Sequence, residues 1–369
     1  MKILHTADLH LGKTLNGYSL LTDQEYIIKK IEDIVINENI DVVVVAGDIF
    51  DRAITSTEAL DIFGEFAGFI NKHNKHLIAI LGNHDGSRIA FLNHILKQNN
   101  IHIVDKVSKI KINDTIFSLI PYLDIHQFRS FYNEDFKTLD EAYKYALDDL
   151  GFDQSCFNVL VAHDYFTYHM EKLIESDSEI RMNIGGLDYL DVEMFKDYNY
   201  VALGHMHKRQ RVGYDYIRYS GSILKYSFSE VNSNKSVVVI DSLDSSFKEI
   251  PLIPKRDLVD IKGTIDELTN PTYYRNYNYN NDFFRAILPK NEVDAYARLK
   301  SIYPNLMEIK VEESVEVRQA EKEIVKEKDY LKLFNVFYKE IDNNDLTPEE
   351  EKIVSSYLGG AQWDLTNLF

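Results

Sequence analysis

Short apolar runs recur along the chain, and each of them stops at a polar side chain. The most regular run lies within DVVVVAGDIFD, residues 41–51, where four consecutive valines lead to Ala46, Gly47 and Asp48. Four β-branched residues are too few for a helix, and they suit a strand buried on both faces, as in a parallel sheet covered by helices. Ligands of open α/β sheets gather at the carboxyl ends of the strands. A lone Asp48 would more often cap a turn, so its role depends on the residues that come after the other strands.

Four more runs are predicted strands that end in the same kind of residue. They span Met1–Thr6, Leu77–Leu81, Phe157–Ala162 and Tyr200–Leu203. The polar residues that follow them are Asp8 and His10, Asn83 and His84, His163, and His205 and His207. Each has an ordinary structural explanation by itself, as a turn former or a solvent-facing strand end, and His5 is expected to be a satisfied core histidine. Their joint occurrence indicates one shared site. Donor sets of nitrogen and oxygen favour Mn²⁺, Fe or Zn²⁺ over sulfur-based sites and over Ca²⁺.

The segments between these strands carry other regular patterns. Apolar residues at i, i+3 and i+4 predict helices over Thr57–Lys72, Phe91–Asn99 and Leu139–Leu150. Residues 106–112 and 115–120 are expected to form a hairpin that turns at Asn113 and Asp114. A second sheet is expected to be continued by Arg218–Tyr219, Ser236–Ile240 and Phe247–Ile250.

The amino-acid composition of the chain changes near Pro251–Lys255. A βαβ-like pattern follows, with strands at Phe283–Leu288 and Met307–Val311 and a helix at Asn291–Ile302. The Asn/Tyr-rich stretch Tyr273–Asn281 suits either base stacking or an ordinary surface loop.

Two amphipathic helices are expected beyond a charged linker at residues 312–328. The first covers Tyr330–Ile341, and the second starts with Thr347 as N-cap and Pro348 at the first helical position. Such a pair needs either this chain's own core or a partner to bury its apolar faces. The expected domains are therefore residues 1–254, 255–312 and 313–369.

Length and composition restrict the class of protein. A chain of 369 residues suggests two or three domains. No apolar run approaches the roughly 18 residues of a membrane span, and no signal peptide precedes the first strand, so a cytoplasmic location is expected. The single cysteine, Cys156, excludes an internal disulfide and fits a reducing compartment.

The net charge of −18 argues against a nucleic-acid substrate, because binding to DNA draws on the neutralisation of phosphates by basic residues. Two bound divalent cations would offset part of this charge at the site itself. A local basic cluster, Lys208, Arg209 and Arg211, follows the last strand of the site. It is either a phosphate contact or a solvated strand edge.

The motifs together resemble those of the calcineurin-like metallophosphoesterases. The matching stretches read MKILHTADLHLGK, AGDIFDRA, LGNHDGSR and GHMHKRQ. A further run, YSGSILKYSFSE at residues 219–230, makes the chain similar to one group in particular, the SbcD-type nucleases. Ile223 replaces a common Pro and Gly86 follows the Asn-His-Asp triplet where the family often has Ser and Pro, and neither is a ligand position. The fold implied is α/β, with two sheets face to face, helices outside, a small α/β capping domain and a C-terminal helical pair.

The resemblance implies a site with two divalent metal ions, most consistent with Mn²⁺. The ligands implied for the first ion are Asp8, His10, Asp48 and His207. Those implied for the second are Asp48, Asn83, His163 and His205, so that Asp48 bridges the two ions. His84 matches a catalytic histidine that is not a ligand, and Asp51 matches the residue that supports it, as a carboxylate partner would.

The activity implied is that of a DNA nuclease that hydrolyses phosphodiester bonds with a metal-activated water. Members of the family degrade double strands as exonucleases and cut single strands and hairpins as endonucleases, in double-strand break repair, recombination and replication. The implied partners are DNA, a coiled-coil ATPase of the SbcC type and a second copy of the chain. The alternatives are a phosphomonoesterase or nucleotide phosphodiesterase on the same scaffold, and a non-catalytic subunit that tethers DNA.

Overall fold

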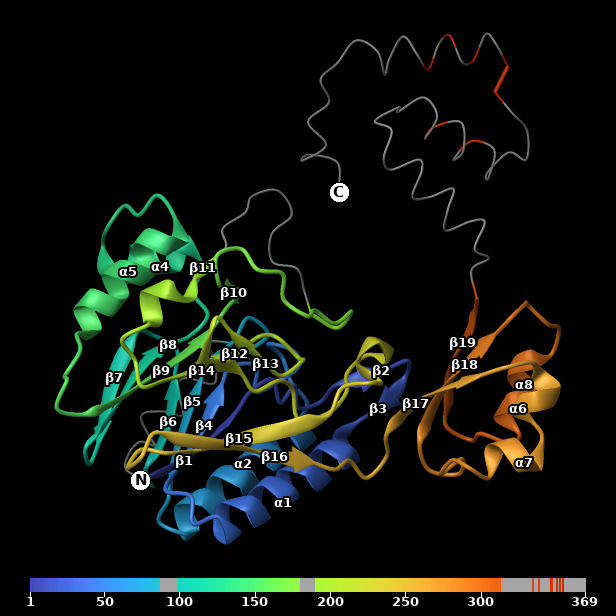
Figure 1. Cartoon of the computed structure of the whole chain (residues 1–369), viewed down its shortest axis with the longest axis horizontal. Coiled ribbons are helices and arrows are strands. Elements are labelled where there is room, and N and C mark those ends of the chain that lie inside the picture. Colours follow the sequence, from blue (N-terminus) through green and yellow to red (C-terminus); the bar gives the residue numbers. More distant parts are fainter. Residues whose placement is uncertain are drawn as a thin grey trace.

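Two six-stranded sheets form the centre of the molecule, as the computed structural model in Figure 1 shows. The structure describes residues 1–86, 99–179 and 190–312, together with isolated residues of the C-terminal stretch. The predicted helix at 91–99 lies outside the described residues except for Asn99, and the one at 330–341 lies outside them except for Phe334 and Tyr338. Thr347 is described and forms reciprocal hydrogen bonds with Glu350, which confirms it as an N-cap.

The first sheet has the strand order β16-β15-β1-β4-β5-β6. Its parallel strands are β1 (Lys2–Thr6), β4 (Val42–Ala46), β5 (His76–Ile80) and β6 (Ile101–Val104). Two antiparallel strands complete it, β15 (Lys235–Asp241) and β16 (Ser246–Leu252). The predicted strands for β1, β4 and β5 are confirmed to within a residue. The expectation that residues 236–240 and 247–250 continue the second sheet is wrong, because β15 pairs along the free edge of β1, with Ile3 opposite Ile240.

The second sheet has the order β13-β14-β12-β9-β8-β7. Its inner strands are parallel and comprise β8 (Thr115–Ile120), β9 (Phe157–His163), β12 (Tyr200–Gly204) and β14 (Tyr214–Tyr219). The antiparallel edges are β7 (Ser108–Ile112) and β13 (Gln210–Val212). The predicted hairpin is present as β7 and β8, and Asn113 has the positive φ of 51° that such a tight turn requires.

The valines of β4 show how the layers are packed. Val42 and Val44 point into the core between the two sheets, whereas Val43 and Val45 point into the core beneath the helices of the first sheet. Both faces of the strand are therefore buried, as its composition predicts. The same alternation continues through the neighbouring strands, so the sheets pack face to face with helices outside each of them.

Helices cover the outer face of each sheet (Figure 1). The first sheet is covered by α1 (Leu21–Asn37) and α2 (Thr57–Lys72), and the second by α4 (Ile125–Tyr132) and α5 (Leu139–Leu150). The bounds of α2 and α5 are as predicted. Helix α1 was not predicted, although Ile27, Ile31 and Val35 have helical spacing and are buried.

A third, smaller sheet follows the sandwich in the chain. It is parallel and consists of β17 (Leu258–Lys262), β18 (Phe283–Leu288) and β19 (Leu306–Val311), with α6 (Ile265–Leu268), α7 (Pro271–Tyr274) and α8 (Ala295–Lys300). The tyrosines at 273, 274, 277 and 279 pack against the core of this unit. The loop at 273–281 therefore fits the surface-loop alternative better than a base-stacking platform.

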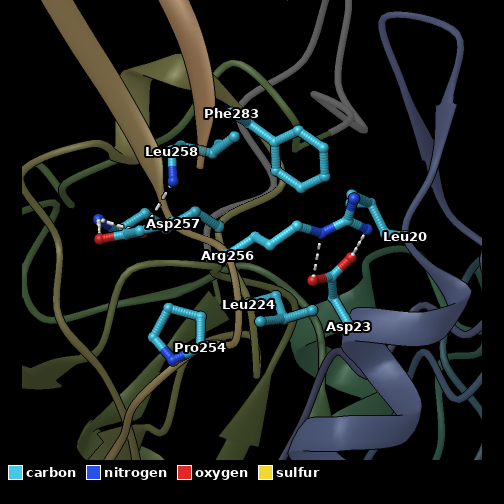
Figure 2. A pocket seen from close by; sticks show the side chains of 9 residues that line it. Leu20, Asp23, Leu224, Pro254, Arg256, Asp257, Leu258 and Phe283 are labelled. Carbon is cyan, nitrogen blue, oxygen red and sulfur yellow. Dashed lines mark hydrogen bonds and ion pairs between the residues drawn. The ribbon is translucent and has the colours of Figure 1, made fainter. Parts of the chain in front are cut away.

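The small sheet is joined to the sandwich by ion pairs at its first strand (Figure 2). The Arg256 guanidinium binds the Asp23 carboxylate of α1, with Nε 2.9 Å from Oδ1, and lies 4.3 Å from the Phe283 ring. Asp23 is only 1% exposed, whereas the Arg256 side chain is 23% exposed, so the carboxylate side of the pair is shielded from water. Beside it, Lys225 Nζ lies 2.9 Å from an Asp257 carboxylate oxygen.

The remaining short elements are local. They are β2 (Thr14–Leu15), β3 (Tyr18–Ser19), β10 (Phe166–Thr167), β11 (Leu190–Asp191) and the 3₁₀ turns η3 (Val192–Phe195) and η4 (Phe228–Glu230). Within the described parts of the chain, no helix has both the length and the apolarity that crossing a membrane requires.

Candidate metal centre

The polar residues predicted from the strand ends lie together where the two sheets meet. Those after β1, β4 and β5 come from the first sheet, and those after β9 and β12 come from the second. Most of them are inaccessible to water, with Asp8, His10 and His163 at 0%, Asp48 and His207 at 2%, and His205 at 5% exposed. Asn83 and His84 are half-buried. Acidic and imidazole groups are rarely buried at this density unless they bind something charged.

The backbone is strained at several of these positions. Asp8, His10, Asp48 and His205 have φ values of 51°, 42°, 49° and 105°. Such left-handed conformations are unfavourable for residues with a Cβ and persist where the surroundings enforce them, often at functional sites. Here the Asp8 N–H donates to Gly47 O over 3.1 Å and the His10 N–H to Asp48 O over 3.0 Å, so the two loops hold one another.

Two glycines allow the close approach of the site's loops. A Cβ on Gly82 would lie 2.2 Å from Asp48 Oδ1, and one on Gly204 would lie 1.7 Å from Ala46 O. Because Gly204 ends β12 and Ala46 ends β4, the second contact brings the two sheets together backbone to backbone. The site depends on this approach, since its residues come from both sheets.

One group of donor atoms contains Asp8, His10 and His207, whose ligating atoms lie within 4.8 Å of one another. The Nε2 atoms of His10 and His207 are 3.0 Å apart. Burial, together with the charges of His207 and His84, holds the pKa of His10 well below its ordinary value. The His10 imidazole is therefore neutral, the form that binds metals.

A second group contains Asp8, Asp48 and His163. His163 Nδ1 donates to Ala46 O over 2.8 Å, which leaves its Nε2 with a lone pair. That Nε2 lies 3.0 Å from Asn83 Oδ1 and 3.6 Å from Asp48 Oδ2. His163 Nε2, Asn83 Oδ1 and Asp48 Oδ2 thus converge, each with a lone pair and without a proton between them. A bound cation stabilises such an arrangement.

Asp48 lies between the two groups. Its Oδ2 is 3.5 Å from His10 Nε2 and 3.6 Å from His163 Nε2. Burial and the charge of Asp48 raise the pKa of Asp8 well above its ordinary value, because two carboxylates in a dry site repel one another. Divalent cations would relieve that repulsion, so the residues present fit a metal centre.

His84 and Asp51 lie next to these groups, but not in the predicted relation. His84 Nδ1 donates to the main-chain O of Asp51 over 2.9 Å, not to its carboxylate. That carboxylate instead lies 2.7 Å from Lys13 Nζ and 3.7 Å from His10 Nδ1. The carbonyl fixes the orientation of the His84 ring. A ligating atom of His84 also lies within 4.8 Å of those of His10 and Asp48, closer than a purely catalytic role requires.

His205 is placed differently from the other predicted ligands. Its main-chain N–H donates to Asp8 Oδ1 over 3.0 Å. Its ring centroid is 5.5 Å from that of His163, and among the described residues it belongs to none of the three-residue groups of converging ligand atoms.

Two comparisons with known proteins bear on this site. The model of the family "Calcineurin-like phosphoesterase" matches residues 1–209, which contain all of the candidate ligands. The D subunit of the nuclease SbcCD of Staphylococcus epidermidis (strain ATCC 12228 / FDA PCI 1200) is 33% identical over 322 residues, covering 83% of this chain and 84% of the relative. The chain belongs to the SbcD family of calcineurin-like phosphoesterases. The resemblance expected from the motifs is confirmed, and the chain is a hydrolase of the phosphoesterase superfamily.

Solved structures with a similar arrangement are more distant from this SbcD-family chain. A novel archaeal phosphodiesterase is 20% identical with a TM-score of 0.33, and the match covers 68% of this chain and 100% of that one. A protein of Thermus thermophilus is 12% identical with a TM-score of 0.42, covering 68% of this chain and 99% of that one.

The structure adds supporting residues that the sequence did not single out in this SbcD-family chain. Gln24 Nε2 of α1 donates to His10 O over 2.6 Å, and the Tyr226 ring lies edge-on to His10 with centroids 5.5 Å apart. The Asp85 carboxylate accepts the main-chain N–H groups of Ile49, Phe50 and Gly82. Asp85 and Tyr226 lie in the recognised motifs, but Gln24 had no local signal, because only the fold brings α1 to the first loop.

The basic cluster after β12 already has partners within the SbcD-family chain. Lys208 Nζ donates to Glu175 O over 2.8 Å, and Arg209 pairs with Glu249. Arg211 lies 2.9 Å from Asp215. These contacts along the edge strand β13 fit the strand-edge alternative better than a phosphate contact.

Proposed function

We propose that this chain is the nuclease subunit of a DNA-processing complex and hydrolyses phosphodiester bonds in DNA with two Mn²⁺ ions. The observation that carries the proposal is the pair of donor groups that meet at Asp48, whose Oδ2 lies 3.5 Å from His10 Nε2 and 3.6 Å from His163 Nε2, in a chain 33% identical to the D subunit of a nuclease SbcCD. Asp8, His10, Asp48 and His207 would hold one ion, and Asp48, Asn83, His163 and His205 the other.

The chain's own residues prepare the reaction. When bound, divalent cations at such a site offset phosphate charge and make water more acidic. Neutral His10 and His163 keep nitrogen lone pairs that would bind the ions, and both side chains are fully buried. His84 is oriented through Nδ1 by the Asp51 carbonyl, and in its imidazolium form its Nε2 would donate a proton or hydrogen bond to the phosphate or leaving oxygen. Such help is typically worth about 10²–10⁴-fold in rate.

The proposal assigns a role to each part of the chain. Residues 1–254 are the nuclease domain, 255–312 cap the site and select DNA ends, and 313–369 bind the coiled coil of an SbcC-type ATPase. A second copy would dock near α2, where Ile54 is 82% and Leu60 41% exposed. The complex would act in the cytoplasm, as a double-strand exonuclease and a single-strand and hairpin endonuclease, in break repair, recombination and replication.

One observation favours a second candidate, a phosphodiesterase or phosphomonoesterase for small nucleotides. The net charge of −18 and the internally paired basic cluster offer little attraction for a DNA backbone.

A nuclease assay separates the two candidates. Purified full-length chain with Mn²⁺ is given end-labelled duplex, hairpin DNA and small phosphoesters, with and without the ATPase partner. The Asp48→Ala variant serves as the negative control for contaminating nuclease. We expect cleavage of both DNA substrates that increases with the partner and ATP. Hydrolysis of small phosphoesters with intact DNA in every mixture would reject the nuclease proposal in favour of the second candidate.

A further inference from the structure

The family-specific run at residues 219–230 leads to two buried charges beside the metal centre that have no role so far. Glu230 is 0% and Lys235 6% exposed. Lys235 Nζ donates to His207 O over 2.8 Å, to Ser222 Oγ over 2.7 Å, and to Glu230 Oε2. Ser222 in turn donates to Leu224 O over 2.8 Å, so its oxygen is free to accept. Three acceptors around one nitrogen require three N–H groups, and Lys235 is therefore an ammonium ion.

Glu230 is the counter-ion and accepts hydrogen bonds at both oxygens. Oε2 faces Lys235, while Oε1 accepts from the Tyr226 N–H over 3.2 Å and from Ser178 Oγ over 2.8 Å. Burial alone would raise the pKa of Glu230, but the Lys235 charge outweighs it and lowers that pKa well below its ordinary value. An ionised carboxylate cannot donate, so the Ser178 hydroxyl must donate to it.

The direction of the Ser178 hydroxyl determines which nitrogen of His207 carries the proton. The only hydroxyl hydrogen of Ser178 is used on Glu230, so its oxygen accepts from Ser176 Oγ and from His207 Nδ1, each 2.7 Å away. The proton of His207 therefore resides on Nδ1. Its Nε2 keeps the lone pair, which faces the donor group of Asp8 and His10.

The loop that carries Ser178 is fixed at three further points. Glu179 Oε1 accepts the His207 main-chain N–H over 2.6 Å, and Ser176 N donates to Glu179 Oε2 over 2.8 Å. The Asp177 N–H donates to Ser229 Oγ over 2.9 Å. The hydroxyl is thus held in place by the same loop that holds the backbone of His207.

We infer that Lys235, Glu230 and Ser178 form a relay that sets the tautomer of His207, which makes them positioning residues for one of the two metal ions. Imidazole ligands in proteins are commonly oriented by an acceptor at the second ring nitrogen, and loss of that acceptor typically costs about 10–100-fold in metal affinity. Here the acceptor is the Ser178 oxygen, and the buried ion pair of Glu230 and Lys235 fixes the direction in which the Ser178 hydroxyl donates. The role toward a metal rests on the proposed function, whereas the tautomer is a property of the chain itself.

The tautomer is tested by ¹⁵N NMR of the metal-free, full-length chain labelled at histidine, with His207→Gln to assign the signals. We expect a protonated Nδ1 and an unprotonated Nε2 in the wild type. In Glu230→Gln, Lys235 holds the amide oxygen, so the amide N–H₂ faces Ser178. The amide and the Ser176 hydroxyl then both donate to Ser178 Oγ, and the Ser178 hydrogen turns to His207 Nδ1. The proton then moves to Nε2. A wild-type His207 protonated at Nε2, or an unchanged tautomer in Glu230→Gln, would overturn the relay.

Metal affinity is tested by titration with Mn²⁺, followed by the electron paramagnetic resonance of the free ion. We expect one of two ions to bind about 10–100-fold more weakly in Ser178→Ala and Glu230→Gln. Ser178→Thr keeps a hydroxyl and should restore binding. The matched control is Glu193→Gln, whose carboxylate accepts from Tyr214 and Lys196 and does not contact the site. Wild-type affinity in Ser178→Ala would reject the inference.

Neither measurement uses DNA, which separates this inference from the proposed function. Circular dichroism verifies that each variant is folded, and if Glu230→Gln is not, the Ser178→Ala and Ser178→Thr pair decides. A wild type that has the expected tautomer and binds two Mn²⁺ ions but cleaves no DNA would refute the nuclease and support the relay.

Discussion

In two histidines of this centre, a hydrogen bond at one ring nitrogen determines which nitrogen remains for the metal site. Ala46 O accepts a hydrogen bond from Nδ1–H of His163, and the Asp51 carbonyl accepts one from Nδ1–H of His84. In both rings the other nitrogen is thereby directed at the space between the sheets. Two main-chain carbonyls thus do for these histidines what a carboxylate does in many metal sites. The residue-scale predictions concern the shared carboxylate and the one histidine whose role is catalytic.

Replacing Asp48 by Ala should remove both metal ions, because its Oδ2 is close to a nitrogen of each group. Elemental analysis of the purified variant measures this directly. Asp215→Ala, which breaks only an exposed ion pair with Arg211, is the control and should keep two ions. Two ions retained by Asp48→Ala would contradict the bridging role.

Replacing His84 by Gln should lower DNA cleavage by about 10²–10⁴-fold, the usual contribution of general acid help, with metal content near that of the wild type. His169→Gln is the control, since His169 is exposed and its partners are Asp191 and the neighbouring Tyr168 ring. Loss of one ion in His84→Gln would instead make His84 a ligand, which its closeness to His10 and Asp48 would allow geometrically.

At the scale of elements, the site is made by strand ends that meet across two sheets. Their nature was predictable, because short apolar runs rich in β-branched residues are typical of strands that are buried on both faces. Assigning β15 and β16 to the correct sheet was not, since an apolar strand such as Val237–Ile240 can pair with any free edge, and that choice depends on long-range contacts. The support of His207 by Ser178 was equally hidden, as the two are 29 positions apart.

Gly204 gives an element-scale prediction. Gly204→Ala should lower the free energy of unfolding by about 1–3 kcal/mol, as overpacking does, because its Cβ would collide with Ala46 O. It should also weaken metal binding, since the ends of β4 and β12 would separate. Gly64→Ala in α2, where nothing lies within 4 Å of the new Cβ, is the control and should stabilise the protein by roughly 0.5–1 kcal/mol. Denaturant unfolding and Mn²⁺ titration measure both effects, and an unaltered Gly204→Ala would contradict the close approach.

At the scale of the whole molecule, the cores that the structure describes belong to the sandwich and to the small sheet. The three cores of the sandwich and the core of the small sheet are built from residues up to 309. The junction at Arg256 and Asp23 fixes the small sheet to α1, so residues 1–312 have the contacts needed to fold together.

Removal of residues 328–369 should therefore leave a folded chain that binds two metal ions and cleaves DNA with Mn²⁺. It should lose association with the SbcC-type ATPase and the stimulation by ATP. Size-exclusion co-elution and the nuclease assay compare it with the full-length chain. Co-elution at the full-length yield would show that the partner docks elsewhere, with the small sheet as the next surface to test.

The pairing of β1 with β15 has a consequence for how the protein matures. β1 leaves the ribosome first, but its antiparallel neighbour at residues 235–241 emerges more than two hundred residues later. Lys235, which holds the main chain of His207, emerges at the same time. Until then Asp8 and His10 follow a strand that lacks one of its two partner strands. We therefore expect metal to be acquired only after β15 has emerged, so that a chain cut short before residue 241 cannot retain it.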